Sequence, residues 1–250
     1  MGAAALGGPL TTRAATRAAP AAATAAATAG QPEALAARAP IAGSVGVLGG
    51  TFDPIHIGHL AAAEEVREAL GLERVLFVPA GIPPHKPGRL ISAPHHRLAM
   101  LELAIAGNPS FEASRVELDR TGPSYTIDTL EALGAGIAGG PPRELTLILS
   151  AESFRGLPSW QQPQRLLALA RVAIVPRGGL APPGKSWLEE HFPGVEARIV
   201  ELDAPRLRLS ATDIRARVAA GRSIRYLVPD AVIHYIEDHD LYRDETWRKN

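Results

Sequence analysis

The stretch Gly49-Gly50-Thr51-Phe52-Asp53-Pro54-Ile55-His56-Ile57-Gly58-His59 joins a short apolar run to an amphipathic segment. The apolar run, residues 44–50, predicts a buried strand that ends in a glycine turn. Residues 58–70 carry apolar side chains at helical spacing and stop before Gly71, so they predict a helix. A helix that begins directly after a strand and a glycine turn can bind anions, because its first N–H groups have no partner within the helix.

The same alternation continues along the chain. Short apolar runs predict further strands at 74–79, 111–118, 145–149, 172–175 and 197–202. Helical patterns fall at 95–106, 124–133, 163–170, 186–192, 211–219 and 230–238. This order predicts an α/β fold: a doubly wound, Rossmann-like parallel sheet with helices on both faces and a C-terminal helical segment. Ligands of such sheets bind at the carboxyl ends of the strands.

The composition excludes several classes of protein. Among 250 residues, 26 Lys+Arg balance 26 Asp+Glu, which argues against a basic surface for nucleic acid or anionic lipid. Cysteine is absent, so disulfides, Cys-ligated zinc and thiol catalysis are excluded. No apolar run is long enough to span a membrane. We expect a cytoplasmic protein without a nucleic-acid or membrane partner, and a homo-oligomer is left open.

The first 44 residues differ from the rest of the chain. They contain 19 alanines and a single acidic residue, Glu33, and they have almost no Val, Ile or aromatic residues. Such a segment buries too little apolar surface to offset its ordering entropy. Residues 1–44 therefore predict a disordered, Ala-rich N-terminal extension, and residues 45–250 the functional domain. An organellar transit peptide and a start codon placed too far upstream are the alternatives.

The first motif has the chemistry of a phosphate site. His56 and His59 stand at the start of the helix, where both imidazoles and the unpaired N–H groups can converge on one anion. Two such donors suit a phosphoryl group that gains charge in its transition state. Gly50 lets the backbone approach a ligand, and Thr51 and Phe52 can offer N–H groups. The alternative is a pair of surface histidines beside an ordinary turn.

A second motif lies near the C-terminus. Its sequence is Leu209-Ser210-Ala211-Thr212-Asp213-Ile214-Arg215. Ser210 is expected to cap the helix that follows, so that the first N–H groups of this helix face nucleotide phosphates. Arg215 can reach the outer phosphates with its charged fork. An ordinary capped helix with an exposed arginine is the alternative for this motif alone.

The two motifs resemble the opening and closing motifs of the nucleotidylyltransferase superfamily, which transfers AMP or CMP to a phosphate. With three further segments, 82–86, 122–130 and 224–242, residues 45–242 are similar to bacterial nicotinate-nucleotide adenylyltransferases. The resemblance implies an enzyme of NAD biosynthesis that converts ATP and nicotinate mononucleotide to nicotinate adenine dinucleotide and pyrophosphate. It also implies Mg²⁺ held by the ATP phosphates, with no protein side chain as metal ligand. An enzyme that prefers or also accepts nicotinamide mononucleotide, and a non-catalytic nucleotide sensor, are the alternatives.

The resemblance also implies a role for each candidate residue. The catalytic candidates are His56 and His59, nearest the reacting α-phosphate, and Arg215, at the outer phosphates. Those expected to bind ATP are Gly50, Thr51, Phe52, Ser210 and Thr212, together with Ser150 and Glu152, which stand where the family has Gly-x-Asp at the ribose. Those expected to bind nicotinate mononucleotide are Tyr125 and Thr126 through N–H groups, Trp160 by stacking on the pyridine ring and Lys86 at the phosphate. For Trp160 the alternative is a half-buried loop residue, and for Lys86 a solvated lysine.

Overall fold

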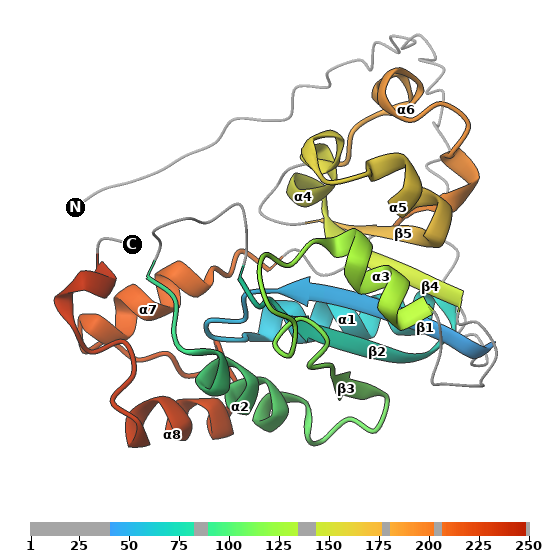
Figure 1. The fold of residues 1–250 in the computed structure, drawn as a ribbon. Helices are drawn as coiled ribbons and strands as arrows, with labels where there is room; N and C mark the ends of the chain where they lie inside the picture. The colour runs from blue at the N-terminus through green and yellow to red at the C-terminus, as the bar shows by residue number, and fades with distance from the viewer. Residues whose placement is uncertain (1–40, 83–89, 135–143, 177–180, 203–206, 249–250) are drawn as a thin grey trace, which may run out of the picture. The chain divides into compact units, whose positions relative to one another are not determined.

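A computed structural model describes residues 41–82, 90–134, 144–176, 181–202 and 207–248. These residues form a six-stranded parallel sheet of order β3-β2-β1-β4-β5-β6 (Figure 1). The strands are β1 (Ile41–Gly50), β2 (Leu72–Pro79), β3 (Phe111–Ala113), β4 (Glu144–Ser150), β5 (Ala170–Val175) and β6 (Ile199–Glu201). The chain builds outward from β1 to β3 and then returns to β4 on the other side of β1. The switch point of the sheet therefore lies between the carboxyl ends of β1 and β4.

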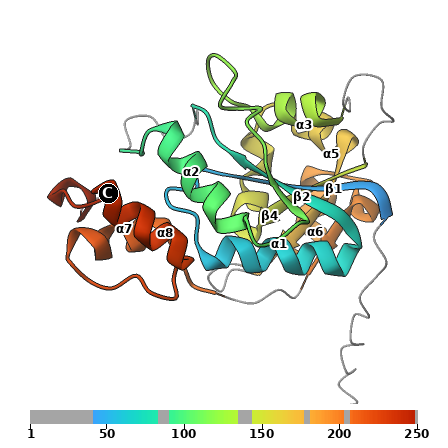
Figure 2. The same ribbon diagram turned by 90° about the horizontal axis from the view of Figure 1, so that it is seen from below.

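Helices cover both faces of this sheet, as the view from below shows (Figure 2). One face packs against α1 (Ile57–Leu70), α2 (Pro94–Ile105), α7 (Ala211–Ala219) and α8 (Asp230–Asp238). The other packs against α3 (Thr126–Gly134), α4 (Ala151–Arg155), α5 (Pro163–Leu169) and α6 (Lys185–His191). Short 3₁₀ turns occur at Leu157–Ser159, Glu196–Arg198 and Glu245–Arg248. Within the described ranges, no helix has the length and apolarity needed to cross a membrane.

Two apolar cores, one on each face, hold these layers together. Along β1, Val45 and Val47 belong to the core under α3–α6, whereas Leu48 belongs to the core under α1, α2, α7 and α8. Successive side chains of a strand point to opposite faces, so a strand covered on both sides must be apolar throughout. The continuous apolar runs in the sequence thus have their physical reason here. The predicted doubly wound sheet is confirmed.

Some predicted boundaries differ from the structure. Strand β1 begins at Ile41, and Ser44 is buried, with its hydroxyl donating to the Ile41 carbonyl (2.5 Å) and accepting from the Glu73 N–H (3.2 Å). The ordered domain therefore starts inside the predicted extension, whose residues 1–40 lie outside the described part of the chain. The strand predicted over 111–118 ends at Ala113, because only residues 111–113 pair with β2. A 3₁₀ turn precedes β6, which begins at Ile199, and the short helix α4 was not predicted.

Candidate active site

The turn after β1 is shaped by a packing requirement. A Cβ on Gly50 would lie 2.8 Å from the ring of Phe52, so only glycine leaves room for that ring. Phe52 is 2% exposed, has φ +49° and meets the His59 ring edge-on at 5.1 Å. Its side chain is anchored in the core. A ligand at this turn would therefore meet the backbone N–H of Phe52 and not its ring.

The two motif histidines lie together at the start of α1. Their rings stack at 3.6 Å between centroids with a 16° interplanar angle, and His56, the N-cap residue, is 3% exposed. The His56 N–H donates to Nδ1 of His59 (3.3 Å), as in a capping box. Since Nδ1 accepts, the proton of a neutral His59 is on Nε2. His59 thus carries an N–H donor at a helix N-terminus even when its ring is uncharged.

The two motifs meet although they are far apart in sequence. Nη1 of Arg215 donates to the carbonyl of Asp53 (2.7 Å) across 162 positions, and Nη2 donates to Oγ1 of Thr212 (3.3 Å). The guanidinium lies over the ring of Trp247 at 5.1 Å. Only 9% of Arg215 is exposed. The structure shows that this arginine links α7 to the first motif, and its reach toward the outer phosphates stays a prediction.

The start of α7 differs in one detail from the prediction. Ser210 occupies the N-cap position with extended backbone, and its carbonyl accepts from the Ile214 N–H (3.0 Å). Its hydroxyl, however, makes no capping hydrogen bond, so the predicted side-chain cap is wrong. The Ser210 hydroxyl therefore takes up none of the first-turn N–H groups of α7, and these groups can face an anion without it.

A third helix start lies at the same edge of the sheet. The Ala80 N–H donates to the Gly50 carbonyl (2.8 Å), and two residues later the Ile82 carbonyl accepts from the Ser124 N–H (3.1 Å). Helix α3 begins at Thr126, directly after this contact. Tyr125 is half-buried against the core under α3–α6. The predicted nicotinate-binding segment is thus linked by backbone hydrogen bonds, through the exit of β2, to the turn at Gly50.

The remaining candidates are placed as follows. Ser150 ends β4, and its hydroxyl accepts from the Ser153 N–H (3.1 Å), so a serine here caps α4. Glu152 is exposed on the first turn of that helix. Trp160 is half-buried against the core under α3–α6. Lys86 lies outside the described residues. The ligand contacts of these four residues stay predictions.

Comparison with known proteins places the chain in a family. The cytidylyltransferase-like family model matches residues 47–217. A probable nicotinate-nucleotide adenylyltransferase of Roseiflexus sp. (strain RS-1) is 52% identical over 200 residues, which are 80% of this chain and 98% of the relative. A protein of the same description from Thermomicrobium roseum is 45% identical over 199 residues, covering 80% of this chain and 91% of that relative. The chain belongs to the nicotinate-nucleotide adenylyltransferase family.

Solved structures support the same fold. The nicotinic acid mononucleotide adenylyltransferase of Plasmodium falciparum, complexed with NaAD, matches with a TM-score of 0.64 at 17% identity, over 80% of this chain and 97% of that chain. The same protein complexed with APC matches with a TM-score of 0.63. At this identity the likeness concerns the fold. This adenylyltransferase chain thus shares its overall fold with these two structures.

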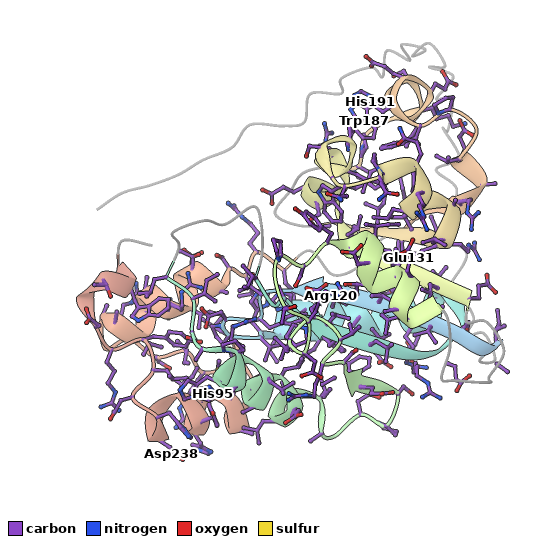
Figure 3. The ribbon with its side chains drawn as sticks, in the orientation of Figure 1. His95, Arg120, Glu131, Trp187, His191 and Asp238 are labelled. Carbon is purple, nitrogen blue, oxygen red and sulfur yellow. The ribbon has the colours of Figure 1, made fainter. Side chains whose placement is uncertain are left out.

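Glu117 is a buried carboxylate that sequence reasoning missed. It is 8% exposed, and the Thr129 hydroxyl donates to its Oε1 (2.8 Å) from α3. Arg120, on the same loop (Figure 3), donates to that hydroxyl at 3.5 Å. A Cβ on Gly81 would collide with the Glu117 carbonyl, so glycine is required where β2 leaves the sheet. Glu117 thus joins α3 to the exit of β2, and no local sequence pattern marks a pair 12 positions apart.

Glu117 gives a testable pH dependence. Burial raises the pKa of its carboxyl, and the hydrogen bonds from Thr129 and Gly81 only partly oppose this. A raised folded-state pKa contributes stability that is present below the unfolded pKa of 4.5 and is lost as pH rises through the folded value. As the pH rises from about 5 to about 8, the unaltered protein should therefore lose unfolding free energy relative to Glu117→Gln. The difference between the two proteins should shift in favour of the variant over this range. Urea titrations at both pH values measure this, and parallel pH profiles would contradict it.

Proposed function

We propose that this chain transfers the adenylyl group of ATP to nicotinate mononucleotide in NAD biosynthesis. A phosphate oxygen of the mononucleotide attacks the α-phosphorus of ATP, and a new P–O bond forms there. The bond between the α-phosphorus and the bridging oxygen breaks, and pyrophosphate leaves with that electron pair. The products are nicotinate adenine dinucleotide and pyrophosphate. The nucleophile belongs to the substrate, so the protein contributes positioning and charge stabilisation.

One observation carries the proposal: the hydrogen bond of 2.7 Å between Arg215 and the Asp53 carbonyl. It brings the C-terminal motif against the turn that precedes His56 and His59. The site combines the imidazoles at the start of α1 with the start of α7, whose Arg215 bonds to the turn before α1. Donors fixed before the reaction stabilise charge that develops on a phosphoryl group without reorganising. The Nε2–H of His59 suits the α-phosphate in this role, and Thr51, Phe52, Ser210 and Thr212 suit the outer phosphates.

The first N–H groups of α3 suit the nicotinate carboxylate. A carboxylate at a helix N-terminus gains both hydrogen bonds and a favourable dipole. The pyridine ring would then stack on Trp160, with Lys86 at the phosphate, and Glu152 is our candidate for the ATP ribose. An amide at the same position carries no charge, and its NH₂ group is a hydrogen-bond donor that cannot accept from the helix N–H groups. The start of α3 therefore favours nicotinate over nicotinamide.

In this scheme Mg²⁺ would enter the site bound to the ATP phosphates. Across the described residues, no group of three or more His, Cys, Asp or Glu side chains could hold a metal ion. The donors at the site are imidazole, guanidinium and backbone N–H groups, which contact phosphate oxygens and do not compete for a hard cation. When bound to the triphosphate, Mg²⁺ would neutralise charge on its oxygens. We also propose that the enzyme acts in the cytoplasm.

The preference for nicotinate gives a direct prediction. Nicotinate mononucleotide should have a kcat/KM at least about tenfold above that of nicotinamide mononucleotide, which is about 1.4 kcal/mol in transition-state binding. Pyrophosphate release with ATP and each mononucleotide in turn measures this. Equal values would show a dual-specificity enzyme. Nucleotide binding without any pyrophosphate release would show a sensor and overturn the proposed reaction.

A further inference from the structure

Asp53, inside the first motif, is the centre of a buried hydrogen-bond network. The residue is 2% exposed. Its Oδ1 accepts from the hydroxyl of Tyr242 (2.6 Å) and its Oδ2 from the N–H of Ser92 (3.0 Å). Its carbonyl accepts from Arg215 (2.7 Å). Three segments that are distant in sequence thus hold one residue of the turn in place.

A second arginine holds the same turn from another side. Arg97, on α2, is 2% exposed; its Nη1 donates to the carbonyl of Thr51 (2.9 Å) and its Nε to that of Ser92 (3.1 Å). A peptide unit is planar, with its C=O and N–H on opposite sides. The bond to the Thr51 carbonyl therefore sets the direction of the Phe52 N–H, which we propose donates a hydrogen bond to an ATP phosphate.

Tyr242 completes the network from the far end of the chain. It is 2% exposed and has φ +64°, a conformation that costs a non-glycine residue energy and persists where the surroundings impose it. Its ring meets that of Trp247 edge-on at 5.1 Å, and Trp247 in turn lies under the guanidinium of Arg215. The segment after α8 therefore holds Asp53 in two ways. Tyr242 bonds to its carboxylate, and Trp247 packs against the Arg215 that bonds to its carbonyl.

We propose that Tyr242 is a positioning residue for adenylyl transfer. It acts through Asp53, whose carboxylate joins it to Ser92, next to the Arg97 that orients the Thr51–Phe52 peptide. In this arrangement the end of the chain sets the direction of the N–H groups that receive the ATP phosphates. The inference rests on the proposed function, because it assigns ATP to this turn. It predicts that loss of one buried hydroxyl weakens the interaction with ATP and leaves that with the mononucleotide in place.

The test is Tyr242→Phe, which removes only the hydroxyl. We expect kcat/KM for ATP to fall about tenfold while KM for nicotinate mononucleotide stays within about twofold. Affinity for a non-hydrolysable ATP analogue, measured by calorimetry, should fall in parallel. The matched control is Tyr235→Phe, whose hydroxyl contacts Nδ1 of His96 (3.0 Å) outside the network; it should keep both constants. A merely structural role would lower thermal stability in Tyr242→Phe without separating the two substrates.

A double-mutant cycle with Asp53→Asn locates the effect. If Tyr242 acts through Asp53, the fold-loss in kcat/KM for ATP of the double variant should be smaller than the product of the two single fold-losses. Independent losses, or a Tyr242→Phe protein that matches Tyr235→Phe, would overturn the positioning role. An unaltered protein that binds ATP and releases no pyrophosphate would overturn the proposed reaction instead. If Tyr242→Phe does not fold, Arg97→Lys replaces it, with the same expected loss of ATP affinity and the same contradicting result.

Discussion

Replacing His59 with alanine should lower kcat by about 10²–10³-fold, the scale for losing one preorganised donor to a developing oxyanion. In the structure, the His56 N–H occupies Nδ1 of His59, so Nε2 is the donating nitrogen of the neutral ring. Alanine removes that donor from the α1 start, and it also removes the Nδ1 that accepts the His56 N–H in the capping box. Turnover at saturating ATP and nicotinate mononucleotide, followed by pyrophosphate release, measures the loss.

The control for His59→Ala is His234→Ala, an imidazole removed from an exposed position on α8. It should keep both its turnover and its melting temperature, whereas His59→Ala should melt slightly lower because it loses the capping contact at Nδ1. His59→Asn is expected to recover part of the lost rate, because its amide can donate a hydrogen bond. A His59→Ala protein with nearly normal turnover, or an activity that requires added zinc, would contradict the donor role.

The sequence predicts the sheet well because the physical signal is local. Each strand of a doubly wound sheet must be apolar on both faces, and each helix on one, so short windows carry the pattern. The sequence does not predict the short helix α4, because its five residues, 151–155, are too few to show a helical period. The predicted strand starts at residue 44 and β1 starts at Ile41, and this difference has another cause. Ile41 is exposed, and the backbone pairing of residue 41 with Leu72 leaves no mark in the hydrophobic pattern.

The site was predicted only where its residues lie close together in sequence. The histidines and the α7 start follow from motifs, whereas Tyr242 and Asp53 are 189 positions apart and neither predicts the other. Gly50 shows a further limit. Its place in the turn was predicted, but the reason found is the Phe52 ring that occupies the space of the missing Cβ. Residue types thus indicate where the chemistry lies, and tertiary packing decides which atoms remain for the ligand.

Arg215→Ala should affect both activity and stability, in contrast to His59→Ala. Its guanidinium holds the Asp53 carbonyl and the Thr212 hydroxyl and lies over Trp247. Removing a buried, charged donor costs about 1.5–3 kcal/mol in the free energy of unfolding. Because the same group is our candidate for the outer phosphates, kcat/KM for ATP should also fall by about 10²–10³-fold. Urea unfolding and steady-state kinetics measure the two effects separately.

Two further variants separate the functions of this arginine. Arg217→Ala, two positions along α7, removes a guanidinium whose Nε donates to the Ser223 carbonyl (2.9 Å) at the surface. It should cost less than about 1 kcal/mol and leave the kinetics unchanged. Arg215→Lys keeps the charge and loses the fork, so one hydrogen bond remains and both effects should be intermediate. If Arg215→Ala lowered stability while the folded fraction kept its kcat/KM for ATP, Arg215 would hold the two motifs together without touching the nucleotide. The outer phosphates would then depend on the helix N–H groups alone.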